Sequence, residues 1–315
     1  MSVVSGQSNG TVEVTPSGIP IFYQSQPKRL YRVGPEVHVE YAEQTPETLL
    51  SLAQAEDTTW VEVPSVTTVL GVLDKPALPW WGMKVGIEGV LALNRQNVLV
   101  SADFHPDAWD KPDAWDVDSI VESMTRYKLT VNHVRDKAGD RGQAVHDALE
   151  NWARHGHMPD PFIYPEEQEG YVRGLVAFLK DVPSAEPEGA EVLVASSEYG
   201  FAGRYDLRLK TSREHEVVVR RTATKVRKRT LLPGRLLADL KTSKGCYPTH
   251  ALQLEAYETA SLESGYESTD GRGILLVTPD GHYEFIRSWA SADDFLNVLA
   301  VYQSLQEMAK RKKAA

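Results

Sequence analysis

The chain of 315 residues is long enough for one large domain or two domains of ordinary size. Hydrophobic residues make up 42% and charged residues 25%, as in soluble globular proteins and unlike disordered or fibrous chains. The sequence has no run of about 18 apolar residues and begins without a secretory signal, so we expect a cytoplasmic protein with no transmembrane helix. The single cysteine, Cys246, excludes an intrachain disulfide and cysteine-rich zinc or iron–sulfur sites.

The charges are unevenly distributed along the sequence. The chain carries 44 Asp or Glu and 34 Lys or Arg residues, which gives a formal net charge of -10. Against this acidic background, residues 213–235 contain eight Lys or Arg residues and only two acidic ones, Glu214 and Glu216. A net acidic chain disfavours nucleic-acid binding over the whole surface, whereas one basic segment is suited to local contact with a polyanion.

The first 63 residues have the pattern of short strands separated by turns. Apolar runs between turn residues predict strands over 19–23, 28–33, 37–41 and 60–63. Ser65 is suited to cap a helix that begins at Val66, and a second helix is expected over 80–97. Residues 101–116 contain Pro-Asp-Ala-Trp-Asp twice and are expected to be a loop.

The rest of the chain changes from helical patterns to strand patterns. Helical spacing of apolar residues predicts helices over 116–137, 140–155, 164–182, 248–264 and 291–312. Alternation predicts strands near 191–199, 203–211, 235–242, 272–278 and 282–287. This order of elements indicates an α/β or α+β fold.

The predicted strand 235–242 places two charged side chains on one face. Because side chains alternate along a strand, Asp239 and Lys241 share a face with Leu237, and the opposite face is entirely apolar. Burying a charged pair costs free energy. A carboxylate beside a lysine could instead hold Mg²⁺ and orient a water molecule. The pattern alone is weak evidence, because many solvent-exposed strands carry it.

Asp206 occupies a comparable position in the preceding predicted strand. It points away from an apolar stripe that begins at Tyr205, and Gly203 before it suits a tight turn. If this strand lies beside 235–242, Asp206 and Asp239 can approach one cation. The alternative is a hairpin in which Asp206 faces solvent between two arginines.

His146 lies on a predicted helix whose start resembles a capping box. Asp140 would be the N-cap residue and Gln143 the third residue of a helix whose core stripe begins at Val145. His146 lies at the border of that stripe. A histidine there is more often a hydrogen-bonded interior residue than a metal ligand.

A further polar group lies on the helix expected over 248–264. His250, Gln253, Leu254 and Tyr257 share one face at the spacing i, i+3, i+4 and i+7. Its polar members need hydrogen-bonding partners, which either an active site or an ordinary polar network would provide.

In their order and spacing, these four groups resemble the motifs of the PD-(D/E)XK nuclease superfamily. The matching segments are Gly142-x-x-Val145-His146, Gly203-x-x-Asp206, Asp239-x-Lys241-Thr242 and Gln253-x-x-x-Tyr257. The resemblance covers about residues 63–305. Within the superfamily, the chain is most similar to the RecB-like branch and to bacteriophage exonucleases related to the CRISPR-associated exonucleases. The resemblance implies a restriction-endonuclease-like α/β (α+β) core, with a mixed central sheet flanked by helices, beside a small β-rich N-terminal module.

The resemblance also implies a set of metal ligands. His146, Asp206, Asp239 and the backbone carbonyl of Leu240 would bind Mg²⁺ or Mn²⁺. Glu198, eight residues before Asp206 in the preceding predicted strand, would bind a second ion or position water. Oxygen ligands of this kind favour Mg²⁺ or Mn²⁺ over softer metals.

Three further residues receive catalytic roles from the resemblance. Lys241 would orient the attacking water or stabilise charge on the scissile phosphate. Gln253 and Tyr257 would support the site and contact the substrate. These roles agree with the chemistry of phosphodiester hydrolysis, in which a cation and a lysine stabilise the negative charge that develops at phosphorus.

The sequence departs from the family pattern in several places. Tyr205 stands before Asp206 where many members have proline, and Asp239 stands where many have glutamate. Many relatives carry four cysteines for an iron–sulfur cluster, which this chain cannot bind. We expect the N-terminal module to replace the structural role of that cluster.

Residues 211–235 form a long connection between two predicted strands and are expected to be a basic hairpin insertion. Contacts between such a hairpin and DNA phosphates would add salt-dependent affinity. The alternative is a charged hairpin that faces only solvent. The expected DNA-binding residues are Arg220, Arg221, Lys225, Arg227, Lys228 and Arg229.

We therefore expect an N-terminal module over 1–62 and a nuclease domain over 63–315, with a helical part (63–185) and a catalytic core (186–315). The expected function is Mg²⁺-dependent hydrolysis of DNA ends, in phage recombination, replication or repair. An exonuclease is favoured over a sequence-specific endonuclease, because the sequence contains no helix-turn-helix or zinc module for reading bases.

Two alternatives stay open at this point. The chain could be a catalytically silent nuclease fold that binds DNA or supports an assembly, or an unrelated α/β protein whose motifs match by chance. The resemblance also raises a single-strand annealing protein as a partner, and an oligomeric assembly. No membrane partner is expected.

Overall fold

The computed structural model describes residues 4–5, 10–25, 30–34, 46–54, 59–73, 75, 77–95 and 117–314. The chain forms two compact units, one of residues 1–73 with 145–315 and the other of residues 74–144. The N-terminal sheet thus belongs to the same unit as the residues from 145 onward. The predicted strand 37–41 and the predicted loop 101–116 lie outside the described residues.

The first sheet is antiparallel, with the strand order β1-β2-β3-β4-β5. Its strands are β1 (Val4–Ser5), β2 (Gly10–Val14), β3 (Pro20–Gln24), β4 (Leu30–Val33) and β5 (Val61–Val63). Helix α1 (Pro46–Gln54) packs on this sheet through Leu49 and Leu50. Ile21 and Tyr31 contribute to a different cluster, which joins this sheet to the second one. The N-terminal sheet is therefore anchored to the central sheet by apolar contacts.

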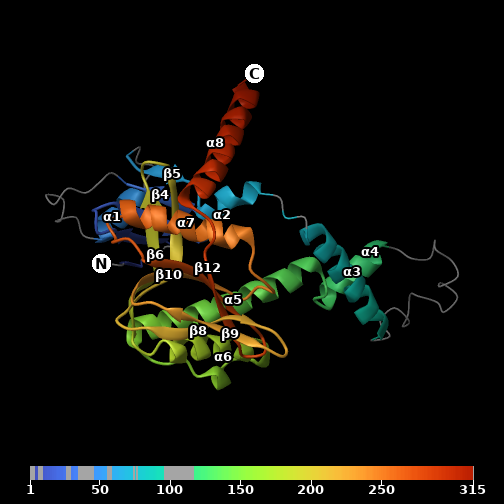
Figure 1. The fold of residues 1–315 in the computed structure, drawn as a ribbon. Coiled ribbons are helices and arrows are strands. Elements are labelled where there is room, and N and C mark those ends of the chain that lie inside the picture. Colours follow the sequence, from blue (N-terminus) through green and yellow to red (C-terminus); the bar gives the residue numbers. More distant parts are fainter. Residues whose placement is uncertain are drawn as a thin grey trace. The chain divides into compact units, whose positions relative to one another are not determined.

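The second sheet is mixed and central to the larger unit (Figure 1). Its order is β12-β11-β10-β7-β6, in which β10 and β11 are parallel and the other neighbours are antiparallel. The strands are β6 (Ala185–Ser196), β7 (Phe201–Thr211), β10 (Gly234–Lys241), β11 (Gly271–Val277) and β12 (Tyr283–Arg287). Between β7 and β10, the basic segment forms a hairpin of β8 (His215–Arg221) and β9 (Val226–Leu231).

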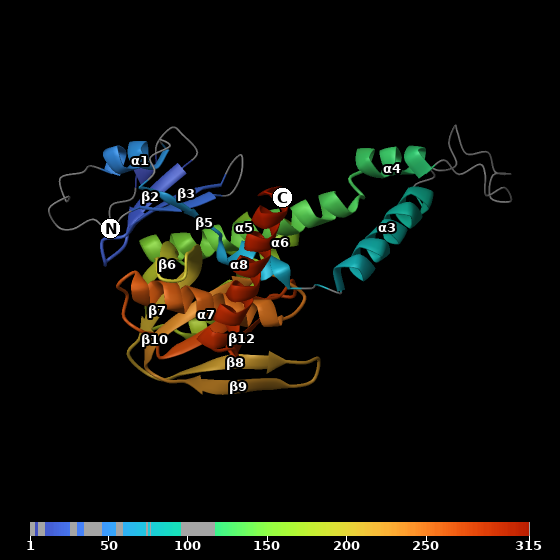
Figure 2. The ribbon, with the colours of Figure 1, turned by 90° about the horizontal axis from the view of Figure 1, so that it is seen from above.

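Helices cover both faces of the central sheet (Figures 1 and 2). One face packs against the part of α5 (Val131–His155) from Val145 onward and against α6 (Glu166–Asp181). The other packs against α7 (Pro248–Glu263), α2 (Val66–Val69) and the first part of α8 (Ala292–Ala314). The predicted α/β class, with a mixed sheet and flanking helices, is thereby confirmed.

The other unit contains α3 (Ala77–Arg95), α4 (Val117–Arg126) and the first residues of α5. Leu93 and Met124 form its small buried cluster. Two 3₁₀ turns complete the described elements, Leu70–Val72 and Pro161–Ile163. None of the helices in the described part of the chain is long and apolar enough to cross a membrane.

Several sequence-based boundaries were wrong. Asp140 is not an N-cap residue, because α5 runs without interruption from Val131 to His155. A capping sequence is only a local preference, and continuing a helix through Gly139 costs about 1 kcal/mol. The predicted helix 116–137 is instead divided at 127–130, between α4 and α5. Strands β1 and β2 and helix α1 were missed.

Helix α6 lies so close to the turn between β11 and β12 that a side chain at Gly170 would overlap the backbone carbonyl of Pro279. Because backbone atoms cannot move aside cheaply, Gly170→Ala is expected to lower the free energy of unfolding by about 2–3 kcal/mol. Chemical denaturation measures this loss. The matched control is Gly139→Ala on α5, where a Cβ would have no atom within 4 Å. It should leave the value unchanged or raise it by up to about 1 kcal/mol, and an equal loss in both variants would contradict this packing.

Candidate metal centre and its surroundings

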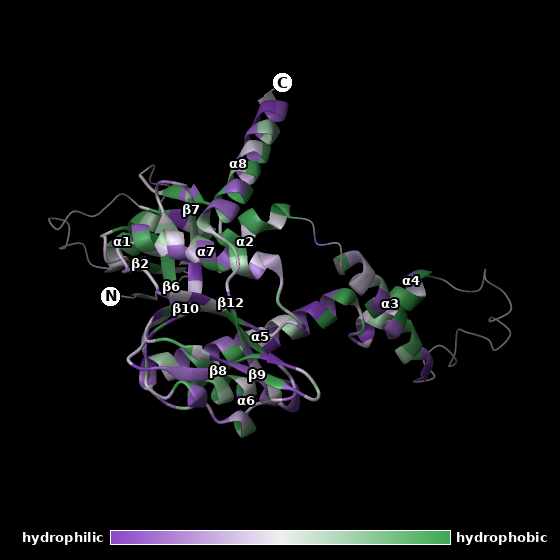
Figure 3. Cartoon of the chain, in the orientation of Figure 1, coloured by the Kyte–Doolittle hydropathy of each residue, from purple (hydrophilic) through white to green (hydrophobic). Residues whose placement is uncertain are grey.

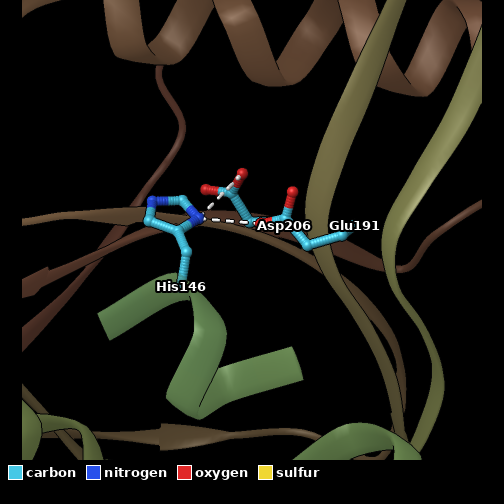
Figure 4. A group of neighbouring side chains, drawn as sticks. All are labelled: His146, Glu191 and Asp206. Atoms are coloured by element: carbon cyan, nitrogen blue, oxygen red, sulfur yellow. Dashed lines mark hydrogen bonds and ion pairs between the residues drawn. The ribbon is translucent and has the colours of Figure 1, made fainter. Parts of the chain in front are cut away.

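Three potential metal ligands converge where α5 approaches β6 and β7. The ligand atoms of His146, Glu191 and Asp206 all lie within 4.8 Å of one another (Figure 4). His146 Nδ1 lies 2.9 Å from Glu191 Oε1 and 3.6 Å from Asp206 Oδ1. The structure thus brings together two of the predicted ligands, His146 and Asp206, with an acidic residue that the sequence did not single out.

Glu191 has an unusual backbone conformation for a strand residue. Its φ is 53°, in the left-handed region that non-glycine residues rarely occupy. The pairs Ala190–Leu207 and Val192–Tyr205 flank it, so Glu191 lies across from Asp206. No sequence signal identifies this residue, because its role depends on a local conformation that an alternation pattern does not predict.

Glu191 also forms an ion pair with Arg204. Arg204 Nε lies 2.8 Å from Glu191 Oε2, and the Arg204 guanidinium lies 5.2 Å from the centre of the Tyr23 ring. Tyr23 belongs to β3 of the N-terminal sheet. The N-terminal sheet therefore contributes to the wall behind Glu191.

Asp206 lies where the regular alternation of β7 is interrupted. Tyr205 packs in the cluster on the α7 side of the sheet, whereas Leu207 packs in the cluster on the α5 and α6 side. The expected single apolar stripe is therefore wrong at this point. Asp206 is buried, and its Oδ2 accepts a hydrogen bond of 2.7 Å from the backbone N–H of Leu240. This bond ties β7 to β10 beyond the last backbone pair between them, Ala238–Leu207.

Leu240 therefore contacts Asp206 through its backbone N–H group, whereas the sequence analysis expected its carbonyl group to take part in the site. The N–H and C=O of one strand residue lie on the same side of the strand, so the Leu240 carbonyl also faces this side. The backbone at Leu240 is in the region where the sequence placed a ligand.

Asp239 and Lys241 form an ion pair next to this group. The Asp239 side chain is fully buried, and both of its oxygens lie within 2.8 Å of Lys241 Nζ. Burial raises the pKa of Asp239 to about 7, although the charge of Lys241 opposes this shift. The predicted division of β10 into two faces is confirmed, because Leu237 packs on the α7 side and Leu236 on the α5 and α6 side.

The acidic side chains of the cluster raise the pKa of the basic groups beside them. Burial lowers the pKa of His146, but the charge of Asp206 and the hydrogen bond with Glu191 raise it more, to about 9. Burial likewise lowers the pKa of Lys241, but the charges of Asp239 and Asp206 raise it above its ordinary value. Both shifts report a local potential that favours positive charge. A cation bound by His146 must displace the proton of its imidazole, so binding there would release a proton.

Helix α7 supplies the polar pair Gln253 and Tyr257. Gln253 Nε2 donates a hydrogen bond of 2.7 Å to the Tyr257 hydroxyl. Burial raises the pKa of the Tyr257 phenol well above its ordinary value, and the nearby charges of Asp206 and Asp239 raise it further. The phenol is therefore neutral at pH 7. Gly203 allows this approach, because a Cβ there would lie 2.5 Å from Cε1 of Tyr257.

Glu198 and His250, which the sequence analysis also singled out, are not members of the His146, Glu191 and Asp206 group. Glu198 is exposed in the turn between β6 and β7, and not in a strand. Asp206 lies five residues beyond Phe201, the first residue of β7, and is therefore roughly 17 Å along the strand from this turn. His250 is near Lys241: burial, together with the lysine charge, lowers the pKa of His250 to about 4, so its imidazole is neutral at pH 7.

The six basic residues predicted to bind DNA are all exposed. They lie on the β8–β9 hairpin and its turn, where Figure 3 shows many hydrophilic residues. The hairpin is fixed to β12, because Val218 N–H donates to the Tyr283 hydroxyl and Arg221 N–H donates to Glu284.

The chain matches no family model and no curated protein.

Proposed function

We propose that the protein is a metal-dependent deoxyribonuclease, and more specifically an exonuclease that hydrolyses phosphodiester bonds at DNA ends. The observation that supports this best is the gathering of His146, Glu191 and Asp206 within 4.8 Å, beside the buried pair of Asp239 and Lys241. Carboxylates that converge on one point with a lysine at their side are suited to phosphoryl transfer with a divalent cation. The proposed role is the processing of DNA in recombination, replication or repair.

The two carboxylates of this donor set suit a hard divalent cation such as Mg²⁺ or Mn²⁺, and the imidazole of His146 adds one nitrogen ligand. Two neighbouring ligands of an octahedral ion with bonds of about 2.1 Å lie about 3 Å apart. His146 Nδ1 is hydrogen-bonded to Glu191 at 2.9 Å and lies 3.6 Å from Asp206, so an ion bound here would replace a hydrogen bond between two of its ligands. His146, Glu191 and Asp206 would hold the ion. Asp239, which the sequence suggested as a further ligand, is not a member of this group, and both of its oxygens lie against Lys241 Nζ.

Each residue then has a defined task. A bound cation would supply charge stabilisation at the scissile phosphate and a more acidic water. The Lys241 ammonium would donate to an oxygen of that phosphate or to the attacking water, and Asp239 keeps this ammonium in place. Tyr257, held by Gln253, excludes bulk water from the α7 side of the two aspartates.

Glu191→Gln is expected to weaken Mn²⁺ binding by at least about tenfold, because the substitution removes a charged ligand while it preserves the size of the side chain. Isothermal titration calorimetry of the whole protein measures the effect. The matched control is Glu198→Gln, which makes the same chemical change in the β6–β7 turn and should leave the affinity unchanged. Equal affinities in Glu191→Gln and the wild type would remove Glu191 from the metal site, and a loss in Glu198→Gln would return Glu198 to it.

The proposed activity is tested with end-labelled linear DNA and covalently closed circular DNA, each with Mg²⁺, Mn²⁺ or EDTA. We expect metal-dependent loss of linear DNA, with circles spared, and the position of the label gives the polarity. Cleavage of circles would indicate an endonuclease. If neither substrate is cleaved while DNA is still bound, the protein is a catalytically silent nuclease fold.

A further inference from the structure

A groove of about 590 Å³ lies between the β8–β9 hairpin and the nearby ends of three strands of the central sheet. Figures 1 and 2 show the hairpin alongside β12 in both views. The groove is lined by Val217 and Arg227 of the hairpin, by Leu236 at the start of β10 and by Phe285 of β12. It is separate from the metal centre, because Leu236 precedes Asp239 by three residues, or about 10 Å along β10.

Four arginines of the groove have no carboxylate partner among the residues that the structure describes. Arg220, Arg227, Arg229 and Arg287 all line it, and no ion pair joins them to an acidic residue in the described part of the chain. The other charges in its wall are engaged elsewhere. Arg272 pairs with Glu255, and Asp270 accepts a hydrogen bond from Arg235 N–H. The groove is therefore strongly positive in a chain whose net charge is -10.

Most of the remaining lining is apolar, with Val217, Val219, Leu231 and Phe285 among its residues. A ligand for this groove must present both negative charge and flat apolar surface. Guanidinium groups bind phosphate in a bidentate manner and stack on bases, which is the chemistry of nucleic-acid recognition.

The groove has the size of a small-ligand site. Its volume of about 590 Å³ lies within the range of about 300–1,000 Å³ that small ligands occupy. A short stretch of single strand fits such a space, and competition with duplex DNA decides between the two forms.

We propose that this groove binds a segment of single-stranded nucleic acid, with phosphates on Arg220, Arg227 and Arg229 and bases over the apolar floor. This deepens the proposed function, on which it rests, by adding a holding site for the substrate strand away from the reacting atoms. Because the groove does not include the metal centre, it sets affinity and leaves the chemical step unchanged.

The strand register supplies a test within the hairpin. Arg227, Arg229 and Leu231 alternate along β9 and line the groove, whereas Lys228 between them does not. The double variant Arg227→Gln/Arg229→Gln should weaken binding of a labelled single-stranded oligothymidylate in EDTA by at least about tenfold. Its slope of log affinity against log salt should become shallower by about 1.4, for two lost phosphate contacts. Lys228→Gln should have a smaller effect on both quantities.

The control for net charge is Lys180→Gln/Lys210→Gln, which removes the same two charges from exposed positions outside the groove. It should leave affinity and slope near the wild-type values. Fluorescence anisotropy measures both, with single-stranded DNA, duplex DNA and polyglutamate as unlabelled competitors. Single strands should compete best.

Equal losses in the groove variant and the charge control would overturn the groove as the binding site. Better competition by duplex, or equal competition by polyglutamate, would overturn its assignment to single strands. Cleavage of linear DNA is measured separately with Mg²⁺. If the protein cleaves DNA but the groove variant binds single strands as well as the wild type does, the groove is rejected as a binding site and the nuclease function stands. If the groove variant weakens binding but the wild-type protein cleaves no DNA, the nuclease function is rejected and the groove stands.

Discussion

Asp206→Asn is expected to reduce metal-dependent DNA cleavage by about 10³-fold or more. Asp206 both faces His146, at 3.6 Å, and accepts the N–H of Leu240, at 2.7 Å. The asparagine has the same shape and can still accept that hydrogen bond, so β7 and β10 should stay together. What it removes is the negative charge at the point where His146 and Glu191 converge.

The measurement is the initial rate of loss of labelled linear DNA with saturating Mg²⁺, together with a thermal unfolding curve. Glu198→Gln provides the control for loss of one carboxylate and should cleave at the wild-type rate. An Asp206→Asn protein that is folded and keeps a tenth of the rate would contradict a role for this carboxylate in the reaction.

Lys241→Met is expected to lower kcat by about 10²–10³-fold while Mn²⁺ binding persists. The methionine keeps most of the length of the side chain but cannot stabilise charge on the phosphate. It also leaves the buried Asp239 without its counter-charge, which favours the protonated form of Asp239. The protein should therefore fold, because a neutral Asp239 is tolerated in that position.

Three measurements on Lys241→Met, of kcat, the unfolding temperature and the Mn²⁺ affinity, separate a catalytic role from a structural one. If Lys241 is structural, the substitution lowers all three together. If Lys241 acts in the reaction, the substitution lowers kcat far more than the other two. A Lys241→Met protein with wild-type kcat would exclude Lys241 from the reaction.

The parts of the fold that could be predicted depend on periodic burial. The two faces of β10 and the core stripe of α5, with Val145, Leu149 and Trp152 buried, follow from spacing alone. His146 was predicted at the edge of that stripe, and its ring is partly exposed as expected. Such features need only the repeat of a helix or strand.

What could not be predicted depends on contacts between distant segments. Glu191 joins the metal centre because its backbone is left-handed and β6 pairs with β7, and neither condition leaves a mark on the sequence. The continuity of α5 across Asp140 has a local cause instead, because helix formation in the residues on both sides outweighed the capping pattern. The groove requires the hairpin to pack against β12, which depends on Tyr283 and Glu284, more than 60 residues away.

The central claim is that His146, Glu191 and Asp206 hold a divalent cation, and anomalous diffraction from crystals soaked in Mn²⁺ tests it most directly. The account predicts an anomalous peak within about 2.5 Å of the His146 imidazole and of the carboxylates of Glu191 and Asp206. The same peak should be absent from crystals of Asp206→Asn. A peak only at other residues, or no peak in crystals of a protein that cleaves DNA with Mn²⁺ in solution, would contradict the account.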